Sequence, residues 1–358
     1  MEKGNETYPQ VSVVVPVKNG AVHIKDLLDS LMRVDYDHDK LEIVIVDGNS
    51  TDHTKEIASK YPVKFILEEK PGINAARNTG VKNSNGEIIA FTDHDCIVPK
   101  NWIKKIVENF QDPKVGCVGG SVLRYNNDFL AQYADESILP VLRFFKKKAV
   151  INRISSPMYF PVGCNFAVKR EAIEKVGFFD ERFKNGFDEL EFAERLCEMG
   201  YKIVLTNEMI VKHKHRSSMR ELLRQTFHYG QGGGLLPKIK GVKSIFSKWV
   251  ILSLTVFTLW FLTLFSLAVY TFFSHSILSL ITFLGLLFFP LFGLMTLYAY
   301  RTFKSKDGKY KRIIAYPMID IARSLTFVAG GIHQIVRSVG TNRFGGLPAR
   351  HLNVKAKR

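Results

Sequence analysis

Two aspartates one residue apart, Asp93 and Asp95, follow a short apolar run at residues 88–91. A strand that ends in this way presents both carboxylates to the crevice beyond the sheet edge, where hard oxygen ligands can hold Mg²⁺ or Mn²⁺ against a diphosphate. The triplet Asp93-His94-Asp95 therefore predicts a nucleotide diphosphate substrate and a divalent cation. A solvated turn is the alternative, because Asp-x-Asp occurs by chance in many loops.

A second acidic group, Asp188-Glu189 with Glu191, opens a segment of helical pattern after Gly186. Carboxylates at the start of a helix are favourable there simply because they face the positive end of the helix dipole. A pair of this kind is also suited to general-base chemistry, in which one carboxylate removes a proton from an attacking hydroxyl. The pair alone does not decide between these two interpretations.

Positioning these groups requires alternating strands and helices. Short apolar runs at 11–15, 41–46, 63–67 and 88–92 alternate with helical patterns, which predicts βαβ units and a mostly parallel sheet covered on both faces. Ligands of such sheets bind beyond the carboxyl ends of the strands, so Pro16, Asp47 and Asp93 should line one crevice. The segment 16–20 lacks the G-x-G-x-x-G pattern, which excludes the usual dinucleotide fold.

The 52 residues from Trp249 to Tyr300 contain no Asp, Glu, Lys or Arg. A hydrocarbon core of ~30 Å needs about 20 helical residues per crossing, so this run predicts two transmembrane helices with a turn at 273–276. The net charge is −2 over residues 1–212, +7 over 213–248 and +11 over 301–358. Basic residues on both flanks predict a multi-pass protein of the cell membrane whose catalytic domain and tail face the cytosol. This distribution argues against nucleic acid as a partner.

Other segments are less distinctive. Pro317, Asp320 and Arg323 make a third membrane crossing by 313–336 less favourable and predict an interfacial or re-entrant helix.

The glycines of 231–234 predict a flexible connection from the soluble domain to the membrane, or a gating loop. Four dispersed cysteines without a C-x-x-C pair are expected to be reduced core thiols, and no signal-peptide pattern precedes the first strand.

Taken in order, these pieces resemble glycosyltransferase family 2 over roughly residues 9–235. They are VSVVVP at 11–16, VIVDGNSTD at 44–52, PGINAARNTG at 71–80, FTDHD at 91–95, GCN at 163–165, GFFD at 177–180 and the acidic pair Asp188-Glu189. Each piece is common alone, but their order is not. The resemblance implies the GT-A fold of nucleotide-diphospho-sugar transferases, followed here by a transmembrane helical hairpin and the interfacial helix.

The resemblance also implies roles for individual residues. The nucleotide-binding residues would be Pro16, Val17, Asn19, Asp47, Arg77, Asn78 and Asp93. Asp93 and Asp95 would bind Mn²⁺ or Mg²⁺, with Asp95 the more direct ligand. His213 matches a late family histidine that completes the metal shell or meets the diphosphate, with His215 as its competitor. Glu189 and Asp188 would be catalytic, with Glu189 as the general base.

Two departures from the family pattern shape the functional hypothesis. Processive members carry Gln-x-x-Arg-Trp where this chain has LRQTFHY at 223–229, and the acidic pair is in the order Asp-Glu instead of Glu-Asp. The first favours addition of one sugar per encounter over polymer synthesis. The second leaves open which carboxylate is the base. The main hypothesis is an inverting, metal-dependent enzyme that moves a sugar from a nucleotide-diphospho-sugar to a lipid-linked or glycan acceptor, such as a polyprenyl phosphate sugar. The alternatives are a processive polysaccharide synthase and a catalytically inactive membrane scaffold.

These arguments divide the chain into four expected regions. Residues 1–235 form the catalytic domain, 236–248 a basic juxtamembrane linker, 249–300 two transmembrane helices, and 301–358 a basic C-terminal region.

Overall fold

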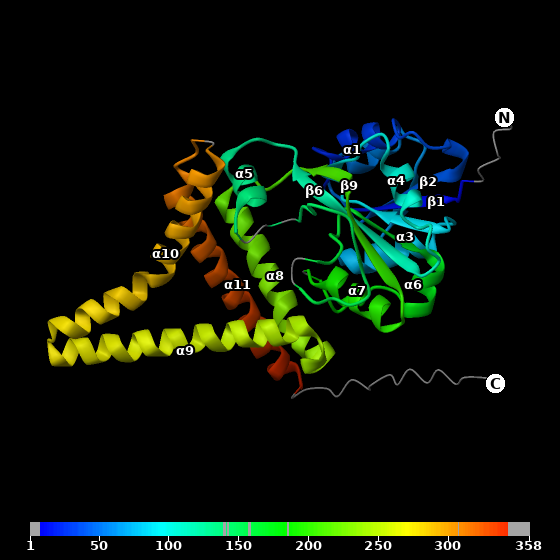
Figure 1. The fold of residues 1–358 in the computed structure, drawn as a ribbon. Helices are drawn as coiled ribbons and strands as arrows, with labels where there is room; N and C mark the ends of the chain where they lie inside the picture. The colour runs from blue at the N-terminus through cyan, green and yellow to red at the C-terminus, as the bar shows by residue number, and fades with distance from the viewer. Residues whose placement is uncertain are drawn as a thin grey trace.

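The computed structural model describes residues 8–138, 141, 143–156, 159–184, 186–306 and 308–342. It consists of an α/β domain and a group of long helices beside it (Figure 1). The α/β class expected from the sequence is confirmed.

The N-terminal half of the sheet is parallel. Its strands are β1 (Val11–Val17), β2 (Leu41–Asp47), β3 (Lys64–Leu67) and β4 (Ile88–Phe91), in the order β3-β2-β1-β4. The runs of β-branched residues form central strands because both faces of the sheet are covered by helices. All four strands lie where the apolar runs predicted them.

The second half of the sheet is mixed, so the expectation of a mostly parallel sheet holds only for the first half. β8 (Phe166–Lys169) lies between β4 and β6 (Val115–Arg124) and is antiparallel to both. β9 (Lys202–His213) is parallel to β6, and the short strands β5 (Cys96–Ile97) and β7 (Ala149–Ile151) pair antiparallel with β9. As a result, β8 starts and β9 ends at the edge where β4 ends.

Helices cover the sheet on both faces, because neighbouring side chains of each strand point to opposite sides. Val13 and Val15 of β1 pack with α1 (Ile24–Leu31), and the same core contains residues of α2 (Thr54–Ala58) and α4 (Trp102–Glu108). On the other face, Val14 packs in a core with α3 (Ile73–Lys82), α6 (Arg170–Val176) and α7 (Asp188–Glu198). The two layers hold the strand ends rigidly, which positions the site.

Four long helices follow: α8 (Met219–Lys240), α9 (Ile245–Ser274), α10 (Ile277–Ser305) and α11 (Arg312–Asn342). Within the described residues, α9, α10 and the segment Arg312–Ser338 are long and apolar enough to cross a membrane. The expected hairpin is confirmed: α9 and α10 project together away from the sheet and are joined at His275, which adopts a left-handed φ of 48° (Figure 1). Their apolar side chains remain largely exposed, as lipid-facing helices require.

The glycine-rich stretch 231–234 is helical, so the expectation of a flexible or gating loop is wrong. It lies within α8, which runs alongside α11 with almost no space between the two backbones. A methyl group added to Gly230 would lie 2.1 Å from the carbonyl oxygen of Phe327, and one on Gly234 would lie 2.6 Å from that of Gly331. Glycine is needed here for close helix packing, as in the small-residue contacts of membrane helices.

The segment 236–248, expected as a linker, comprises the end of α8, a short 3₁₀ turn at Gly241–Lys243 and the start of α9. The α/β domain and the hairpin are thus connected by nearly continuous helix.

A buried polar cluster fastens the long helices to the domain through α5 (Phe129–Glu136). Asp320 of α11 accepts hydrogen bonds from the hydroxyls of Tyr133 in α5 and Tyr298 in α10, the latter at 2.6 Å. Arg323 donates to the Tyr133 hydroxyl at 2.9 Å. Asp320 is only 1% exposed, so the charge that weakened this segment as a membrane span is used to bind α11 to the domain.

Candidate active site

A cavity of about 1090 Å³ lies at the edge of the sheet where β4 and β9 end and extends to the long helices. One end is lined by residues at or just after the ends of β1 and β4, including Pro16, Lys18 and Asp93. The middle is lined by Arg77, Asp188 and Glu189, and the far end by α8, α9 and α11. The cavity therefore joins the crevice expected from the sequence to the helices that could enter a membrane.

Asp93, Asp95 and His213 come together at the first end. Asp93 and Asp95 follow β4, His213 ends β9, and one donor atom from each lies within 4.8 Å of the others. His213 Nε2 is 3.3 Å from Asp95 Oδ1. Asp95 Oδ1 and His213 Nδ1 are buried, and within the described part of the chain neither has a hydrogen-bond partner. Because buried polar atoms are nearly always satisfied, this donor set fits a divalent cation with oxygen and imidazole ligands.

The charges of the two aspartates support this fit. Burial and the neighbouring Asp95 raise the pKa of Asp93 to about 6, although Arg77 opposes the shift. Burial would also raise the pKa of Asp95, but His213, His94 and Arg216 outweigh it and hold that pKa below its ordinary value. Two carboxylates that cannot both ionise easily would be relieved by a cation between them.

His215, the competitor of His213, has a different partner. Its Nε2 lies 3.2 Å from Asp135 Oδ1 on α5, and its ring stands 5.2 Å from that of His213. His215 lines the cavity but does not belong to the group formed by Asp93 and Asp95.

Burial lowers the pKa of His213 to about 4, so its imidazole is neutral and suited to bind a metal.

The two carboxylates expected to be catalytic, Asp188 and Glu189, both bind Arg77 on α3. Its Nη1 donates to Asp188, and its Nη2 donates to Glu189 Oε1 at 3.2 Å and to the Gly163 carbonyl at 3.2 Å. Burial and the charge of Glu189 raise the pKa of Asp188, against the opposing effect of Arg77. The guanidinium of Arg77 is thus bound to Asp188, Glu189 and the Gly163 carbonyl and is not directed at a nucleotide sugar.

The two carboxylates differ in access. The Asp188 side chain is 2% exposed and the Glu189 side chain 18% exposed. A Cβ atom on Gly163 would lie 1.9 Å from Glu189 Oε1, so only glycine leaves room for this carboxylate. Glu189 is therefore the carboxylate that a molecule in the cavity can reach more readily.

The predicted nucleotide-binding residues fall into two groups. Pro16, Val17, Arg77 and Asp93 line the cavity. Asn19, Asp47 and Asn78 are not among its lining residues, in the part of the chain that the structure describes.

Two of these three residues hold the loops at the sheet edge: Asn19 links the loop after β1 to the loop after β2, and Asp47 holds the turn that follows it in the chain. Asn19 Oδ1 accepts from the Thr51 amide at 2.9 Å, and Asp47 accepts from the Ser50 amide at 3.0 Å. Asn78 binds the backbone of Phe179 from α3, with its amide donating at 2.9 Å. In this structure the three side chains hold the walls of the site.

Sequence reasoning missed the far end of the cavity. It is lined by polar and apolar side chains: Arg143, Arg224, Gln225, His228, Tyr229, Trp249, Val250, Phe327 and Val328. Burial lowers the pKa of Arg143 to about 10, against the opposing effect of Glu189. These residues come from α8, α9, α11 and the segment after α5, which carry no motif. The one available signal was the basic and aromatic character of residues just before the uncharged run.

Comparison with known proteins is consistent with this geometry. The family described as "Glycosyl transferase family 2" matches residues 12–177. Glycosyltransferase AglE of Haloferax volcanii is 31% identical over 235 residues, which are 63% of this chain and 73% of that protein. A dolichyl N-acetyl-alpha-D-glucosaminyl phosphate 3-beta-D-2,3-diacetamido-2,3-dideoxy-beta-D-glucuronosyltransferase of Methanococcus voltae is 26% identical over 249 residues, again 63% of this chain and 73% of the relative.

Among solved structures, the mannosyltransferase PcManGT from Pyrobaculum calidifontis, in complex with GDP-Man and Mn²⁺, is similar in fold. Its TM-score is 0.58 at 24% sequence identity, and the match covers 90% of this chain and 88% of that one. The expected GT-A fold is therefore confirmed, and the match extends over the long helices as well as the sheet.

Proposed function

The chain belongs to glycosyltransferase family 2 and is a nucleotide-sugar glycosyltransferase, and from this premise we propose that it transfers one sugar, with inversion, to a lipid-linked acceptor at the membrane. The observation that carries the proposal is a single cavity that contains Asp93, Asp95 and Glu189 at one side and reaches the apolar side chains of α9 and α11 at the other.

In the proposed reaction Glu189 takes the proton of the acceptor hydroxyl as its oxygen attacks the anomeric carbon and the nucleoside diphosphate leaves. The environment supports this role, because Glu189 is partly exposed in the cavity and its Oε1 is held by Arg77 at 3.2 Å. Asp188 is buried against the same guanidinium and would position Arg77 and, through it, Glu189.

The leaving group carries the negative charge that develops in the reaction. A divalent cation, Mn²⁺ or Mg²⁺, held by Asp93, Asp95 and His213 would supply the positive charge that neutralises the diphosphate. His213 Nδ1 supports this assignment, because it is buried and the described residues provide no hydrogen-bond partner for it. Pro16 and Val17 line the same end of the cavity and would contact the nucleotide, with Asn19, Asp47 and Asn78 supporting the walls.

A lipid-linked acceptor is supported by the change in lining along the cavity. Trp249, Val250 and Phe327 offer apolar surface for a lipid chain, and Arg224, which is exposed, offers positive charge for a phosphate. The Methanococcus voltae relative is named for a dolichyl phosphate sugar, which is an acceptor of this class. Together with the basic flanks of the hairpin, this favours a multi-pass membrane protein with its cavity on the cytosolic side.

Two experiments test the proposal. A thermal-shift screen of UDP- and GDP-sugars with Mn²⁺ or Mg²⁺ should identify the donor, because a bound ligand stabilises the folded state by mass action. The matching labelled donor should then transfer its sugar to a hydroxyl of an extractable polyprenyl-linked sugar. Stabilisation by a donor without label in any lipid would contradict the acceptor class and leave the donor assignment intact.

A further inference from the structure

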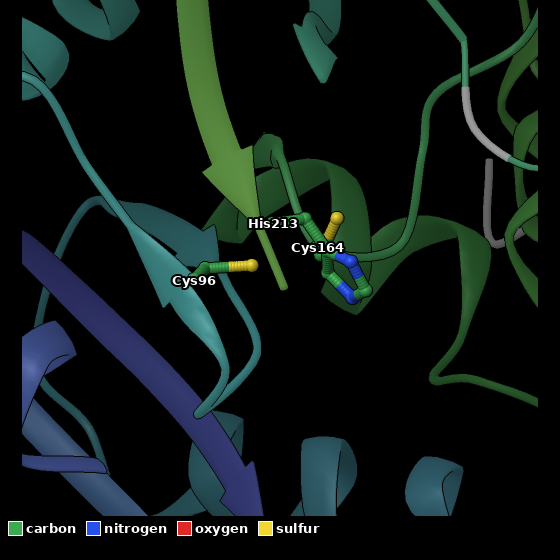
Figure 2. Close-up of side chains that lie close together, drawn as sticks. All are labelled: Cys96, Cys164 and His213. Carbon is green, nitrogen blue, oxygen red and sulfur yellow. The ribbon is translucent and has the colours of Figure 1, made fainter. Parts of the chain in front are cut away.

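Two cysteines and a histidine meet beside the carboxylate pair (Figure 2). Cys96 lies in β5, Cys164 lies just before β8, and His213 ends β9, directly opposite Cys96 in the β5–β9 pairing. All three are buried, and one donor atom from each lies within 4.8 Å of the others. Figure 2 shows the Cys96 sulfur directed toward the side chains of Cys164 and His213.

The ligand atoms of Cys96, Cys164 and His213 differ in chemistry from those of the carboxylate group formed by Asp93 and Asp95. Two sulfurs and an imidazole suit a soft or borderline cation, whereas carboxylates suit Mg²⁺ and Mn²⁺. In a tetrahedral zinc site with Zn–S bonds of about 2.3 Å, two sulfurs stand about 3.8 Å apart. Donor atoms already within 4.8 Å of one another therefore need only small side-chain adjustments to bind such an ion.

A second observation points to a ligand at this place. His213 Nδ1 and Asp95 Oδ1 are both buried and, across the residues described, without a hydrogen-bond partner. The histidine has two ring nitrogens and stands between the carboxylate pair and the thiol pair. His213 is thus shared by two groups of possible ligands, Asp93 with Asp95 and Cys96 with Cys164.

We propose that Cys96, Cys164 and His213 form a binding site for a thiophilic divalent cation such as Zn²⁺ or Cd²⁺, and that its occupation inhibits glycosyl transfer. On binding, the two thiols release their protons to solvent and each sulfur forms a bond to the cation, while His213 contributes a nitrogen. Inhibition follows because His213 is then no longer available to the cation held by Asp93 and Asp95. This inhibitory effect rests on the function proposed above, whereas binding of the cation does not.

Binding is tested first by titrating the full-length protein in detergent with Cd²⁺, in the presence of a phosphine reductant. The thiolate-to-cadmium absorption band in the ultraviolet should rise to one equivalent in the parent. It should fall by at least about tenfold at equal Cd²⁺ in Cys96→Ala and in Cys164→Ala, since both thiolates are required. Cys197→Ala is the matched control and should keep the band. A parent without the band, or a band unchanged in both variants, would overturn the site.

Inhibition is tested with the same proteins in excess Mn²⁺. Zn²⁺ should inhibit transfer by the parent and by Cys197→Ala at the same concentration, and Cys96→Ala should need at least about tenfold more. Equal inhibition of all three with the cadmium band lost would place inhibitory zinc at the carboxylates and contradict the regulatory half. If the parent transfers no sugar, the proposed function fails while the cadmium titration still decides the site.

Discussion

At the scale of single residues, the acidic pair shows how one buried arginine can give two adjacent carboxylates different tasks. Arg77 is 1% exposed and binds both Asp188 and Glu189, but only Glu189 retains accessible surface. Residues next to each other at a helix start point about 100° apart, so only one can face the reacting carbon. The geometry favours Glu189 as the base and Asp188 as the residue that positions Arg77.

This assignment predicts different results from two isosteric variants. Glu189→Gln keeps the hydrogen bond to Arg77 but removes basicity, so transfer should fall about 10²–10⁴-fold while donor binding persists. Asp188→Asn should cost less transfer but lower the thermal midpoint more, because it removes charge from a fully buried ion pair. If Glu189→Gln turned over like the parent and Asp188→Asn were inactive, Asp188 would be the base and Glu189 the residue that positions Arg77.

Metal removal gives a second prediction at this scale. Asp95→Ala should reduce transfer about 10²–10³-fold, the scale of losing one electrostatic stabiliser of the transition state. Excess EDTA should reduce the activity of the parent similarly, and added Mn²⁺ or Mg²⁺ should restore only the parent. Asp135→Ala, which changes the partner of His215, is the matched control and should stay metal-responsive. Undiminished parent activity in excess EDTA would refute the metal role of Asp93 and Asp95.

The residue types in the sequence predicted where the candidate site lies, but not which residues distant in the sequence contact one another there. The position of Asp93 and Asp95 at the sheet edge was predictable, because the apolar run of a strand ends at residue 92 and both aspartates come directly after it. The wall-building roles of Asn19 and Asn78 were not, because they depend on loops that come from distant positions such as Thr51 and Phe179. The same holds for Cys96 and Cys164, which appear in the sequence as two unrelated core thiols.

At the scale of secondary-structure elements, the contact of α8 with α11 lies where the cavity meets the long apolar helices. Arg224 and Tyr229 of α8, and Phe327 of α11, line the cavity on the same side as the glycine contact. A change in the distance between these helices would therefore alter the far end of the cavity.

The close packing predicts a strong effect of one methyl group. Gly230→Ala would place Cβ 2.1 Å from the backbone oxygen of Phe327, so the helices must separate, at a cost of about 1–3 kcal/mol. The thermal midpoint in detergent should fall. Gly285→Ala in α10, where a Cβ meets nothing within 4 Å, is the control and should be neutral or stabilising. Equal midpoints for the two variants would contradict the packing.

The success of sequence reasoning also varied among elements. The runs at 11–15, 41–46 and 88–92 are strongly β-branched and were predictable as central strands. The glycines of 231–234 were misjudged, because glycine marks either flexibility or close approach and only the partner helix α11 decides between them. The antiparallel insertion of β8 was not predictable, because it depends on where a long connection re-enters the sheet.

At the scale of the whole molecule, charge and packing together predict the topology. The hairpin projects from the domain, whereas α11 stays beside α8 and is bound to α5 through Asp320 (Figure 1). This arrangement supports the prediction that 313–336 lies at the interface, although Arg312–Ser338 is long and apolar enough to cross.

Single-cysteine labelling of intact cells distinguishes the two topologies. His275→Cys, at the hairpin tip, should react with a membrane-impermeant thiol reagent added outside. Lys309→Cys and Ser338→Cys, at the two ends of α11, should react only after permeabilisation. Labelling of Ser338→Cys from outside would mean that α11 crosses the membrane, and labelling of Lys309→Cys from outside would invert the whole orientation.

The most direct test of the account is transfer of a labelled sugar by the purified protein in vesicles that contain polyprenyl-linked sugars. With the donor identified by thermal shift, label should enter the organic-extractable fraction, require Mn²⁺ or Mg²⁺, and fall about 10²–10⁴-fold in Glu189→Gln. Label that is released only as free sugar, or that reaches lipid equally well in Glu189→Gln, would contradict a Glu189-assisted transfer to a lipid-linked acceptor.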